Sequence, residues 1–376
     1  MRALFYLLFA GMYYIWRFLL PIRQDWVVMI NTHDRDMDGN VGQVYQALHK
    51  RYGHLKFFWI RRIPFRPFRP ARVFEAFQYM VVNPYLLARA RYIFLDNVFL
   101  PFAFMRFRKD VKVVQLWHGC GAIKKFGQDV NRGLLRYLEK KANARYTDLV
   151  VNSQSVVSQY ISAFGVSEKI LRVTGLPRTD YFLDPDRVER GRQTFFERYP
   201  ELRGKKLLLY SPTFRDHEVR NPQVPLDFAQ LTLLLGDEWR FLLRLHPYVA
   251  RFADIKRKHV VDVSDYPDLN GLLAASDVLV TDYSSIIFEY SLLNKPMVFY
   301  PYDLESFRSH QRGFYVDYER FVPGPIVRNE EHLAETVKHG LNPAMSSAFR
   351  DQYFDYLDGK STERLIALVV DIRPPL

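Results

Sequence analysis

Two histidines stand directly after predicted strands, where they could take part in acid–base chemistry. His118, with Gly119 beside it, follows the apolar run 112–116, and His246 follows the run 240–245. Imidazole ordinarily titrates with a pKa of about 6.5, so it can take a proton from a hydroxyl at neutral pH. The glycine would let a substrate approach the backbone closely. His118 is therefore the candidate general base; the alternative is a structural histidine in a loop.

A strand–turn–helix pattern in the second half of the chain could bind a phosphate. The run 278–280 is typical of a parallel strand buried on both faces, and a helical apolar pattern resumes over 286–293. Between them lie Asp282, Ser284 and Ser285, residue types favoured at helix N-termini. A helix N-terminus offers backbone N–H groups and the positive end of the helix dipole, which attract anions. The alternative is that the serines only cap the helix.

Arginines follow predicted strands at separate places, at Arg178, Arg215 and Arg244. A guanidinium can bind phosphate through two hydrogen bonds, so this repetition favours an anionic ligand over solvated surface arginines. Lys124, in the loop after the first histidine, could also attract phosphate. Glu289 lies one turn along the helix that follows the two serines, where it could accept hydrogen bonds from ribose hydroxyls.

Short apolar runs alternate with helical stretches along the whole chain. This alternation predicts two α/β domains with parallel sheets. In such sheets ligands bind beyond the carboxyl ends of the strands, which is where the candidate residues fall. The predicted strands are 26–31, 56–60, 92–95, 112–116, 148–151, 170–174, 206–210, 240–245, 278–281 and 296–299.

The composition supports two domains and an anionic partner. The chain has 376 residues, more than one compact domain usually holds, and 48% of them are apolar. A formal charge of +12 favours phosphates, nucleic acid or acidic lipid as partners. The single cysteine, Cys120, excludes an intrachain disulfide and a Cys-based zinc cluster. No local feature supports it as a thiol nucleophile, and we expect neither a metal nor another cofactor.

The N-terminal segment is expected to associate with a membrane. Residues 3–16 are almost wholly apolar and are flanked by Arg2, Arg17 and Arg23. A helix of that length spans about 21 Å, less than the ~30 Å hydrocarbon core, so we expect it to lie in the interface of the cytoplasmic leaflet. A buried core helix is the alternative. A signal peptide is disfavoured because no small-residue cleavage site follows.

A second segment, 54–77, agrees with membrane association because it interleaves phenylalanines and a tryptophan with basic residues. Such a composition suits the headgroup region of an anionic bilayer. It could also stack on single-stranded nucleic acid, which we rank lower, and we expect no nucleic-acid partner. The predicted location is the cell membrane, as a peripheral protein on its cytoplasmic face; an oligomer is compatible with the sequence.

The loop 34–40 imitates the start of a calcium-binding loop. Its twelfth position would be Tyr45, where calcium loops need a bidentate glutamate. We therefore predict an ordinary polar loop in which Gly39 permits a turn before the next helix.

The motifs together resemble the CDP-glycerol glycerophosphotransferases of wall teichoic acid synthesis, the TagB/TagF type. The resemblance extends from about residue 31 to residue 327. It depends on motifs that occur in one order: Trp117-His118-Gly119 with Lys124, Gly175-Leu176-Pro177-Arg178-Thr179-Asp180, Ser211-Pro212-Thr213-Phe214-Arg215, Arg244-Leu245-His246-Pro247, and Thr281-Asp282-Tyr283-Ser284-Ser285 through Glu289.

This resemblance implies a GT-B-like fold of two Rossmann-like domains facing across a cleft, with CDP-glycerol as donor and a lipid-linked acceptor. It implies that His118 and His246 are the essential histidines. The donor-binding positions it implies are Arg178, Pro212, Thr213, Arg244, Ser284, Ser285 and Glu289. We add as candidate substrate-binding residues Trp117, Gly119, Lys124, Arg215 and Asp282.

The expected division of the chain follows from these motifs. Residues 1–22 form a membrane-associating helix, 23–185 an acceptor domain and 186–346 a CDP-glycerol-binding domain. The remaining 347–376 contains a last helix, 347–368, that could cross back to the first domain.

The sequence departs from the pattern of the polymerising members of the family. Polymerases often have Thr-Pro-Leu before the lysine, where this chain has Cys120-Gly121-Ala122-Ile123, and Glu289 stands where an aspartate is common. The chain also lacks the long N-terminal region of the polymerases, so it looks more like the primase. The primase adds the first glycerol phosphate to the undecaprenyl-diphosphate-linked N-acetylmannosaminyl-N-acetylglucosamine disaccharide.

Three alternatives remain open. The chain could be a poly(glycerol phosphate) or ribitol-phosphate polymerase of the same family. It could be a sugar-nucleotide glycosyltransferase of the same fold, or a basic module that binds membranes or nucleic acid without catalysis.

Overall fold

The chain forms two compact units, each built on a parallel sheet. The computed structural model describes residues 2–32, 37, 39–61, 73–213, 215, 224–246, 249, 259–310 and 313–371. Unit 1 comprises Met1–Gly119, Phe126–Asp180 and Lys360–Leu376, and unit 2 comprises Cys120–Lys125 and Tyr181–Gly359. Most of the polar loop 34–40, and residues 62–72 of the aromatic and basic segment, lie outside the described residues.

Unit 1 contains a six-stranded sheet in the order β2-β1-β3-β4-β5-β6, with every described pairing parallel. Its central strands are almost wholly buried, as near-continuous apolar runs predict. Because β1, β3 and β4 are neighbours, the residues just beyond their carboxyl ends meet at one edge. The strands are β1 (Arg23–Asn31), β2 (Lys56–Arg61), β3 (Ala90–Leu95), β4 (Lys112–Gln115), β5 (Asp148–Val151) and β6 (Leu171–Val173).

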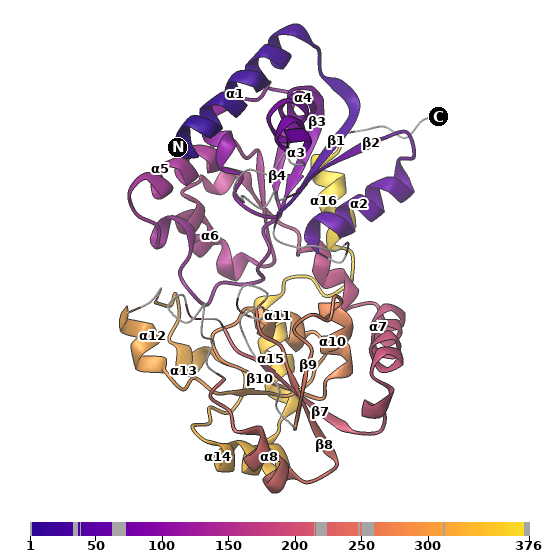
Figure 1. The fold of residues 1–376 in the computed structure, drawn as a ribbon, viewed down its shortest axis with the longest axis vertical. Coiled ribbons are helices and arrows are strands. Elements are labelled where there is room, and N and C mark those ends of the chain that lie inside the picture. The colour runs from indigo at the N-terminus through magenta and orange to yellow at the C-terminus, as the bar shows by residue number, and fades with distance from the viewer. Residues whose placement is uncertain are drawn as a thin grey trace. The chain divides into compact units, whose positions relative to one another are not determined.

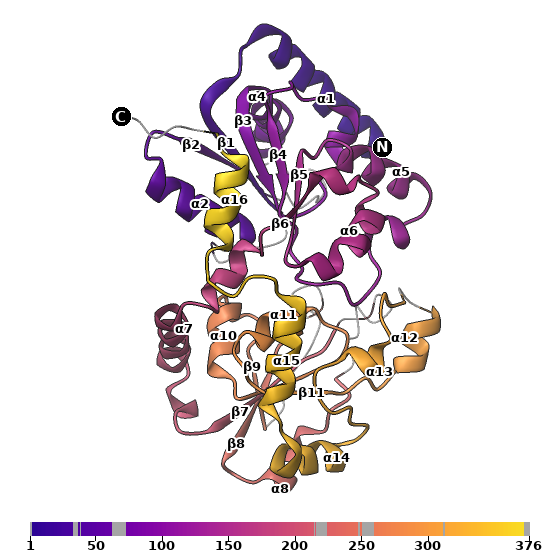
Figure 2. The same ribbon diagram turned by 180° about the vertical axis from the view of Figure 1, so that it is seen from behind.

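Helices cover both faces of this sheet (Figures 1 and 2). On one face α2 lies beside α16, the last helix of the chain, in both views. On the other, α1 packs on α4 and on the 3-10 helix η3 (Leu100–Phe104), which α5 also contacts. The helices of unit 1 are α1 (Arg2–Leu19), α2 (Asn40–Arg51), α3 (Val73–Phe77), α4 (Asn83–Arg89), α5 (Gly133–Asn143), α6 (Val157–Phe164) and α16 (Ser361–Val369), with a π-helical turn η2 (Gln78–Val82) between α3 and α4.

The carboxylate of Asp180 fixes the start of α16 in unit 1. It accepts hydrogen bonds from the backbone N–H groups of Ser361 and Thr362, at 2.9 and 2.8 Å, and from the Thr362 hydroxyl at 2.7 Å. This is the capping pattern that satisfies the first N–H groups of a helix, supplied here from a distant loop. The single terminal helix expected over 347–368 is wrong. Two helices, α15 (Pro343–Tyr353) in unit 2 and α16, take its place.

Helix α1 buries one side and exposes the other. Phe9 and Tyr13 are fully buried, and the Tyr13 hydroxyl donates to the Arg106 carbonyl at 3.1 Å. Leu4, Leu8 and Phe18 lie on the opposite side and are exposed. Among the described helices, none is both long enough and apolar enough to cross a bilayer.

Unit 2 contains a five-stranded parallel sheet in the order β11-β10-β7-β8-β9. The strands are β7 (Lys206–Ser211), β8 (Trp239–Leu243), β9 (Val260–Asp262), β10 (Val278–Thr281) and β11 (Met297–Phe299). The helices are α7 (Pro185–Arg198), α8 (Phe228–Leu235), α10 (Leu269–Ala275), α11 (Ile286–Ser291), α12 (Leu304–His310), α13 (Tyr318–Phe321), α14 (Glu330–Glu335) and α15.

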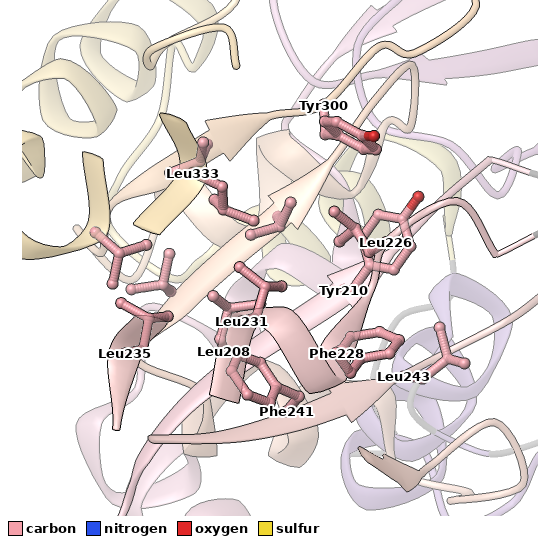
Figure 3. Packing of buried hydrophobic residues seen from close by; sticks show 14 of the residues in the cluster. Leu208, Tyr210, Leu226, Phe228, Leu231, Leu235, Phe241, Leu243, Tyr300 and Leu333 are labelled. Carbon is pink, nitrogen blue, oxygen red and sulfur yellow. The ribbon is translucent and has the colours of Figure 1, made fainter. Parts of the chain in front are cut away.

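A continuous apolar core joins this sheet to α8 and α14 (Figure 3). Leu208 and Phe241 from the strands pack with Phe228 and Leu231 of α8, and Leu333 of α14 closes the cluster. Burying side chains of this size stabilises by roughly 1.5–3 kcal/mol each. This core fixes the strands and therefore the loops that leave their carboxyl ends.

All the predicted strands are present, with ends that differ by a few residues. The predictions missed β9, a partly exposed strand of three residues at the sheet edge, which is too short for an apolar pattern to reveal. The units separate between Asp180 and Tyr181, a few residues before the expected boundary. Residues 120–125 belong with unit 2, although they lie within the stretch expected to form the first domain.

Candidate functional site

The loop that carries His118 begins with a strained backbone at Trp117. Trp117 has a φ of 58°, in the left-handed region that residues with a side chain rarely adopt. Its N–H donates to the Gln115 side chain at 2.9 Å, and its carbonyl accepts from the Asn40 amide at 2.9 Å. The surrounding side chains therefore hold this conformation from both sides of the residue.

The His118 ring is oriented by a backbone carbonyl. Its Nδ1 lies 3.0 Å from the carbonyl oxygen of Asp96, the residue just after β3. A carbonyl oxygen can only accept, so Nδ1 carries the hydrogen and the neutral ring has its lone pair on Nε2. Asp96 is in turn held by its carboxylate, which accepts from the Thr32 N–H at 2.9 Å. This is the tautomer in which Nε2 can accept a proton.

Arg178 lies against the same loop. It is 9% exposed, and its Nη1 donates to the His118 carbonyl at 3.0 Å. Its own N–H donates to the Asn40 Oδ1 at 2.9 Å. The structure thus brings Trp117, His118 and Arg178 together in unit 1, and binding of donor phosphates by Arg178 stays a prediction.

Aromatic side chains pack against the loop that carries His118. The Trp117 ring lies 4.0 Å from the His118 ring and also contacts Phe126 and Phe164, with centroids 5.4 and 5.1 Å away. The Tyr160 hydroxyl donates to the Gly119 carbonyl at 3.0 Å. These contacts leave the backbone on both sides of His118 with fixed partners.

The segment directly after Gly119 packs in unit 2. The Ile123 carbonyl accepts from the Tyr315 N–H at 2.9 Å, and the Lys125 N–H donates to the Gly313 carbonyl at 3.1 Å. Lys124 forms an antiparallel bridge with Phe314 between them. Lys124 is therefore a residue of unit 2, although it follows the His118 motif in the sequence.

Gly121 should tolerate no side chain, and this is our first prediction. It has a φ of +66°, and a Cβ there would lie 1.9 Å from the Phe288 ring of α11. We expect Gly121→Ala to lower the free energy of unfolding by about 2–5 kcal/mol, since backbone strain and overpacking add. Urea-induced unfolding measures this loss.

Gly204 provides the matched control, because it lies in the same unit with a φ of +75° and nothing within 4 Å of its Cβ position. Gly204→Ala should lower the unfolding free energy by only about 1–2 kcal/mol, from backbone strain alone. Adding Phe288→Leu to Gly121→Ala should recover part of the loss. Equal losses in the two alanine variants would contradict the proposed overlap.

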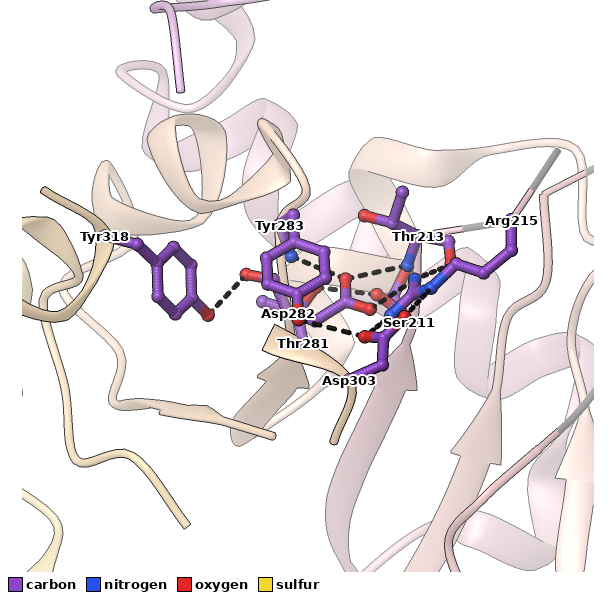
Figure 4. Close-up of polar contacts among 8 residues, drawn as sticks. All are labelled: Ser211, Thr213, Arg215, Thr281, Asp282, Tyr283, Asp303 and Tyr318. Carbon is purple, nitrogen blue, oxygen red and sulfur yellow. Dashed lines mark hydrogen bonds and ion pairs between the residues drawn. The ribbon is translucent and has the colours of Figure 1, made fainter. Parts of the chain in front are cut away.

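In unit 2, hydrogen bonds between loops tie together the carboxyl ends of β7 and β10 (Figure 4). The Thr281 hydroxyl donates to the Ser211 carbonyl at 2.6 Å. Asp282 is 1% exposed, and its Oδ1 accepts from the N–H groups of Thr213 and Tyr283, at 2.8 and 2.6 Å. Asp282 thus holds the backbone of the loops after β7 and β10 together. Its direct contact with a substrate stays a prediction.

Arg215 forms a buried ion-pair network in the same place. Its side chain is 1% exposed. Nη1 donates to Asp282 Oδ2 at 2.8 Å, while Nε and Nη2 donate to the two oxygens of Asp303 at 2.9 and 2.6 Å. We predicted from the sequence that this guanidinium binds phosphate. In the structure it donates hydrogen bonds to two carboxylates and to the Thr213 carbonyl. These contacts hold the loop after β7 in place, and contact of Arg215 with a substrate phosphate stays a prediction.

The charges in this network reinforce one another. Burial disfavours the Arg215 charge, but Asp282 and Asp303 outweigh it and raise the pKa of the guanidinium. Burial, with Asp303 and Asp282 nearby, raises the pKa of the Tyr283 hydroxyl, which donates to Asp303 at 2.9 Å. Burial and Asp282 likewise raise the pKa of Tyr318, whose hydroxyl donates to the Asp282 carbonyl at 2.9 Å. At physiological pH the arginine stays charged and both tyrosines stay neutral donors.

The remaining predicted residues stand at neighbouring strand ends of unit 2. Arg244 and His246 follow β8, and the Arg244 Nη1 donates to the carbonyls of Val263 and Tyr266 at 3.1 and 2.9 Å. Pro212 follows β7 and is partly exposed. The candidate catalytic histidines thus belong to different units.

The predicted phosphate-binding turn follows β10. The Ser284 hydroxyl accepts from the Ile286 N–H at 3.3 Å, and Ser285 is the residue before α11. The Glu289 side chain is 4% exposed. Ser284 therefore accepts from the first N–H of α11, whereas Ser285, the N-cap residue, makes no side-chain cap hydrogen bond. Phosphate binding at this turn stays a prediction. Within the described ranges, no group of three or more acidic, histidine or cysteine side chains is placed to hold a metal ion.

Sequence reasoning missed several residues that shape these edges. They are Asn40, Asp96 and Gln115 around His118, and Asp303 and Tyr318 around Asp282. Gln115 stands just before the His118 motif, but the others lie far along the chain from the residues they support, and Asp303 lies 88 positions after Arg215. For all of them except Gln115, the pairing of strands in each sheet brings the two residues together.

Two parallel-sheet α/β units with polar residues at their strand ends define a protein of the GT-B-like class. A solved structure described as the wall teichoic acid polymerase TagF superposes with a TM-score of 0.80, covering 96% of this chain and 93% of that one at 22% identity. This likeness confirms the predicted fold class.

The family follows from the sequence comparison. The family described as CDP-Glycerol:Poly(glycerophosphate) glycerophosphotransferase matches residues 12–371, and the chain belongs to it. It is accordingly an enzyme of the CDP-alcohol phosphotransferase class, as the motifs predicted.

Two curated relatives come from Bacillus spizizenii strain W23. The chain is 35% identical to a teichoic acid ribitol-phosphate primase, covering 95% of this chain and 94% of the relative. It is 34% identical to a teichoic acid poly(ribitol-phosphate) polymerase, covering 96% of this chain but only 59% of the relative.

Proposed function

We propose that this enzyme transfers sn-glycerol 3-phosphate from CDP-glycerol to the undecaprenyl-diphosphate-linked N-acetylmannosaminyl-N-acetylglucosamine disaccharide and releases CMP. The family description, which names CDP-glycerol, supports the donor. The 35% identity to a teichoic acid ribitol-phosphate primase supports addition of a first unit. The observation that carries the chemistry is the His118 ring, whose Nδ1–H is fixed on the Asp96 carbonyl and whose Nε2 can take a proton.

The proposed reaction is an in-line displacement at phosphorus. An acceptor hydroxyl oxygen attacks the β-phosphorus of CDP-glycerol, and its proton passes to Nε2 of His118. The bond from the β-phosphorus to the bridging oxygen breaks, and CMP leaves with that oxygen and its charge. Arg178, Arg244, His246 and the Ser284 turn are proposed to bind the diphosphate and offset this charge.

The deciding experiment supplies CDP-glycerol and a soluble disaccharide-diphospholipid analogue to the purified enzyme. We expect CMP release and a product heavier by one glycerol phosphate, measured by mass spectrometry. A ladder of products would favour a polymerase instead. Release of UDP from UDP-sugars would favour a glycosyltransferase, and failure to bind CDP-glycerol would favour a module without catalysis.

CDP-ribitol is the second candidate donor. The relative matched over 94% of its length is a ribitol-phosphate primase. CDP-ribitol should therefore be tested as a donor beside CDP-glycerol. Both donors should be offered together at equal concentration, and the product masses compared. Exclusive addition of ribitol phosphate would replace glycerol in the proposal while leaving the phosphotransfer chemistry unchanged.

We further propose that α1 binds the cytoplasmic leaflet through its exposed side, which is our second prediction. Leu4, Leu8 and Phe18 are 61%, 59% and 90% exposed along one stripe of this helix. Replacing all three by serine should weaken binding to anionic liposomes by at least about 10-fold, since each buried apolar side chain contributes roughly 1.5–3 kcal/mol. Vesicle co-sedimentation measures the loss.

Point substitutions are needed because deleting the helix would also remove the buried Phe9 and Tyr13. Turnover of a soluble acceptor analogue should stay within about twofold of the original enzyme. Leu233 in unit 2, which is 86% exposed, provides the matched control, and Leu233→Ser should leave liposome binding unchanged. Unchanged binding in the triple variant would contradict the proposed membrane contact.

A further inference from the structure

Asn40 joins the segments that surround His118. It is the first residue of α2 and is fully buried. Its Nδ2 donates to the Trp117 carbonyl at 2.9 Å, with the Leu116 carbonyl 3.4 Å away. Its Oδ1 accepts from the Arg178 N–H at 2.9 Å. One side chain therefore connects the start of α2, the loop after β4 and the loop after β6.

The partners of this amide determine both its orientation and its identity. The Trp117 carbonyl can only accept and the Arg178 N–H can only donate, so the Nδ2 and Oδ1 assignments cannot be exchanged. An aspartate would offer the acceptor without the donor, and an aliphatic residue would offer neither. Asparagine supplies both groups on one planar amide at this position.

The two contacts act on the backbone on either side of His118. Nδ2 holds the carbonyl of Trp117, whose left-handed φ of 58° needs support. Oδ1 holds the backbone of Arg178, whose guanidinium in turn donates to the His118 carbonyl at 3.0 Å. The peptide groups before and after His118 thus both depend on Asn40, and so does the alignment of the ring with Asp96.

We propose that Asn40 is a positioning residue for His118 in phosphotransfer. The inference rests on the proposed function for its kinetic consequences, but its structural part does not depend on the identity of the donor. Without the Nδ2 donor, the Trp117–His118 peptide relaxes and the Nδ1–H of His118 loses its alignment with the Asp96 carbonyl. Small displacements of a catalytic group lower the rate of the chemical step more than they weaken ground-state binding.

The test is Asn40→Asp, which keeps the size and the acceptor but replaces the donor with a carboxylate oxygen. We expect kcat to fall by about 10- to 100-fold, while KM for the donor stays within about twofold. Asn143→Asp is the matched control. Asn143 is 1% exposed in the same unit, and its Nδ2 donates to the Phe164 carbonyl at 2.8 Å. The control should lower stability without lowering kcat of the folded enzyme.

A second measurement separates this inference from the proposed function. In enzyme labelled with 15N-histidine, the His118 Nδ1–H resonance, assigned by its loss in His118→Ala, should shift or disappear in Asn40→Asp and persist in Asn143→Asp. If the enzyme does not turn over CDP-glycerol, the proposed function fails, yet this resonance still decides the role of Asn40. Should Asn40→Asp not fold, Asn40→Ala, which removes both amide contacts, is measured in its place and should shift or remove the same resonance. An unchanged resonance, or an equal loss of kcat in both aspartate variants, would overturn the inference.

Discussion

His118→Ala is expected to lower kcat for phosphotransfer by about 10²- to 10⁴-fold, because the acceptor hydroxyl would lose its general base. The structure sharpens this expectation. The Asp96 carbonyl holds the hydrogen on Nδ1, so the neutral ring presents a basic Nε2. KM for the donor should change little, since the base acts on the acceptor. Steady-state CMP release with the soluble acceptor analogue measures both constants.

His49 is a suitable control for this substitution. It lies in the same unit, in α2, and is exposed, with its ring stacked on Tyr45 at 5.5 Å. His49→Ala should leave kcat unchanged. Full activity of folded His118→Ala would remove the imidazole from the mechanism, and an equal loss in both variants would point to a general effect on the fold.

Arg215→Met is expected to lower the free energy of unfolding by about 3–5 kcal/mol, because it leaves the buried carboxylate of Asp282 and the partly buried one of Asp303 without their cation. The guanidinium now contacts both Asp282 and Asp303, and Asp282 is 1% exposed. Arg215→Lys should recover only part of the loss, since an ammonium cannot reproduce the fork that meets two oxygens of Asp303. Urea-induced unfolding measures each variant.

Charge removal within the network provides the informative comparison. Adding Asp303→Asn to Arg215→Met should recover part of the lost stability, because one unpaired carboxylate is then neutral. Arg320 provides the control. It is 89% exposed and pairs with Asp317 at 3.5 Å, so Arg320→Met should change the unfolding free energy by less than about 1 kcal/mol. Equal losses for Arg215→Met and Arg320→Met would show that the buried network does not stabilise unit 2.

The fold was predictable because buried parallel strands leave a strong local pattern. Runs such as 148–151 and 278–281 are short, wholly apolar or nearly so, and followed by polar turns. Their predicted bounds match β5 and β10. The strand β9 was not predicted, because an edge strand of three partly exposed residues has no such pattern. We did not predict that residues 120–125 belong to unit 2, because this depends on their pairing with residues 313–315, far along the chain.

The sequence by itself determined where the reactive groups stand along the chain. It placed His118, His246, Arg244 and the Ser284 turn just beyond strands, because parallel α/β sheets end in polar loops. Only the tertiary structure decided what surrounds each group. The parallel pairing of β3 with β4 places the Asp96 carbonyl on the His118 ring. In unit 2 the strand order, which differs from chain order, brings the residues after β7 and β11 close enough for Arg215 to bind Asp303. Hydrogen bonds between loops join residues that are distant in the sequence and leave no local sequence pattern. The partners of a reactive side chain can therefore be identified only from the paired strands of the folded sheet.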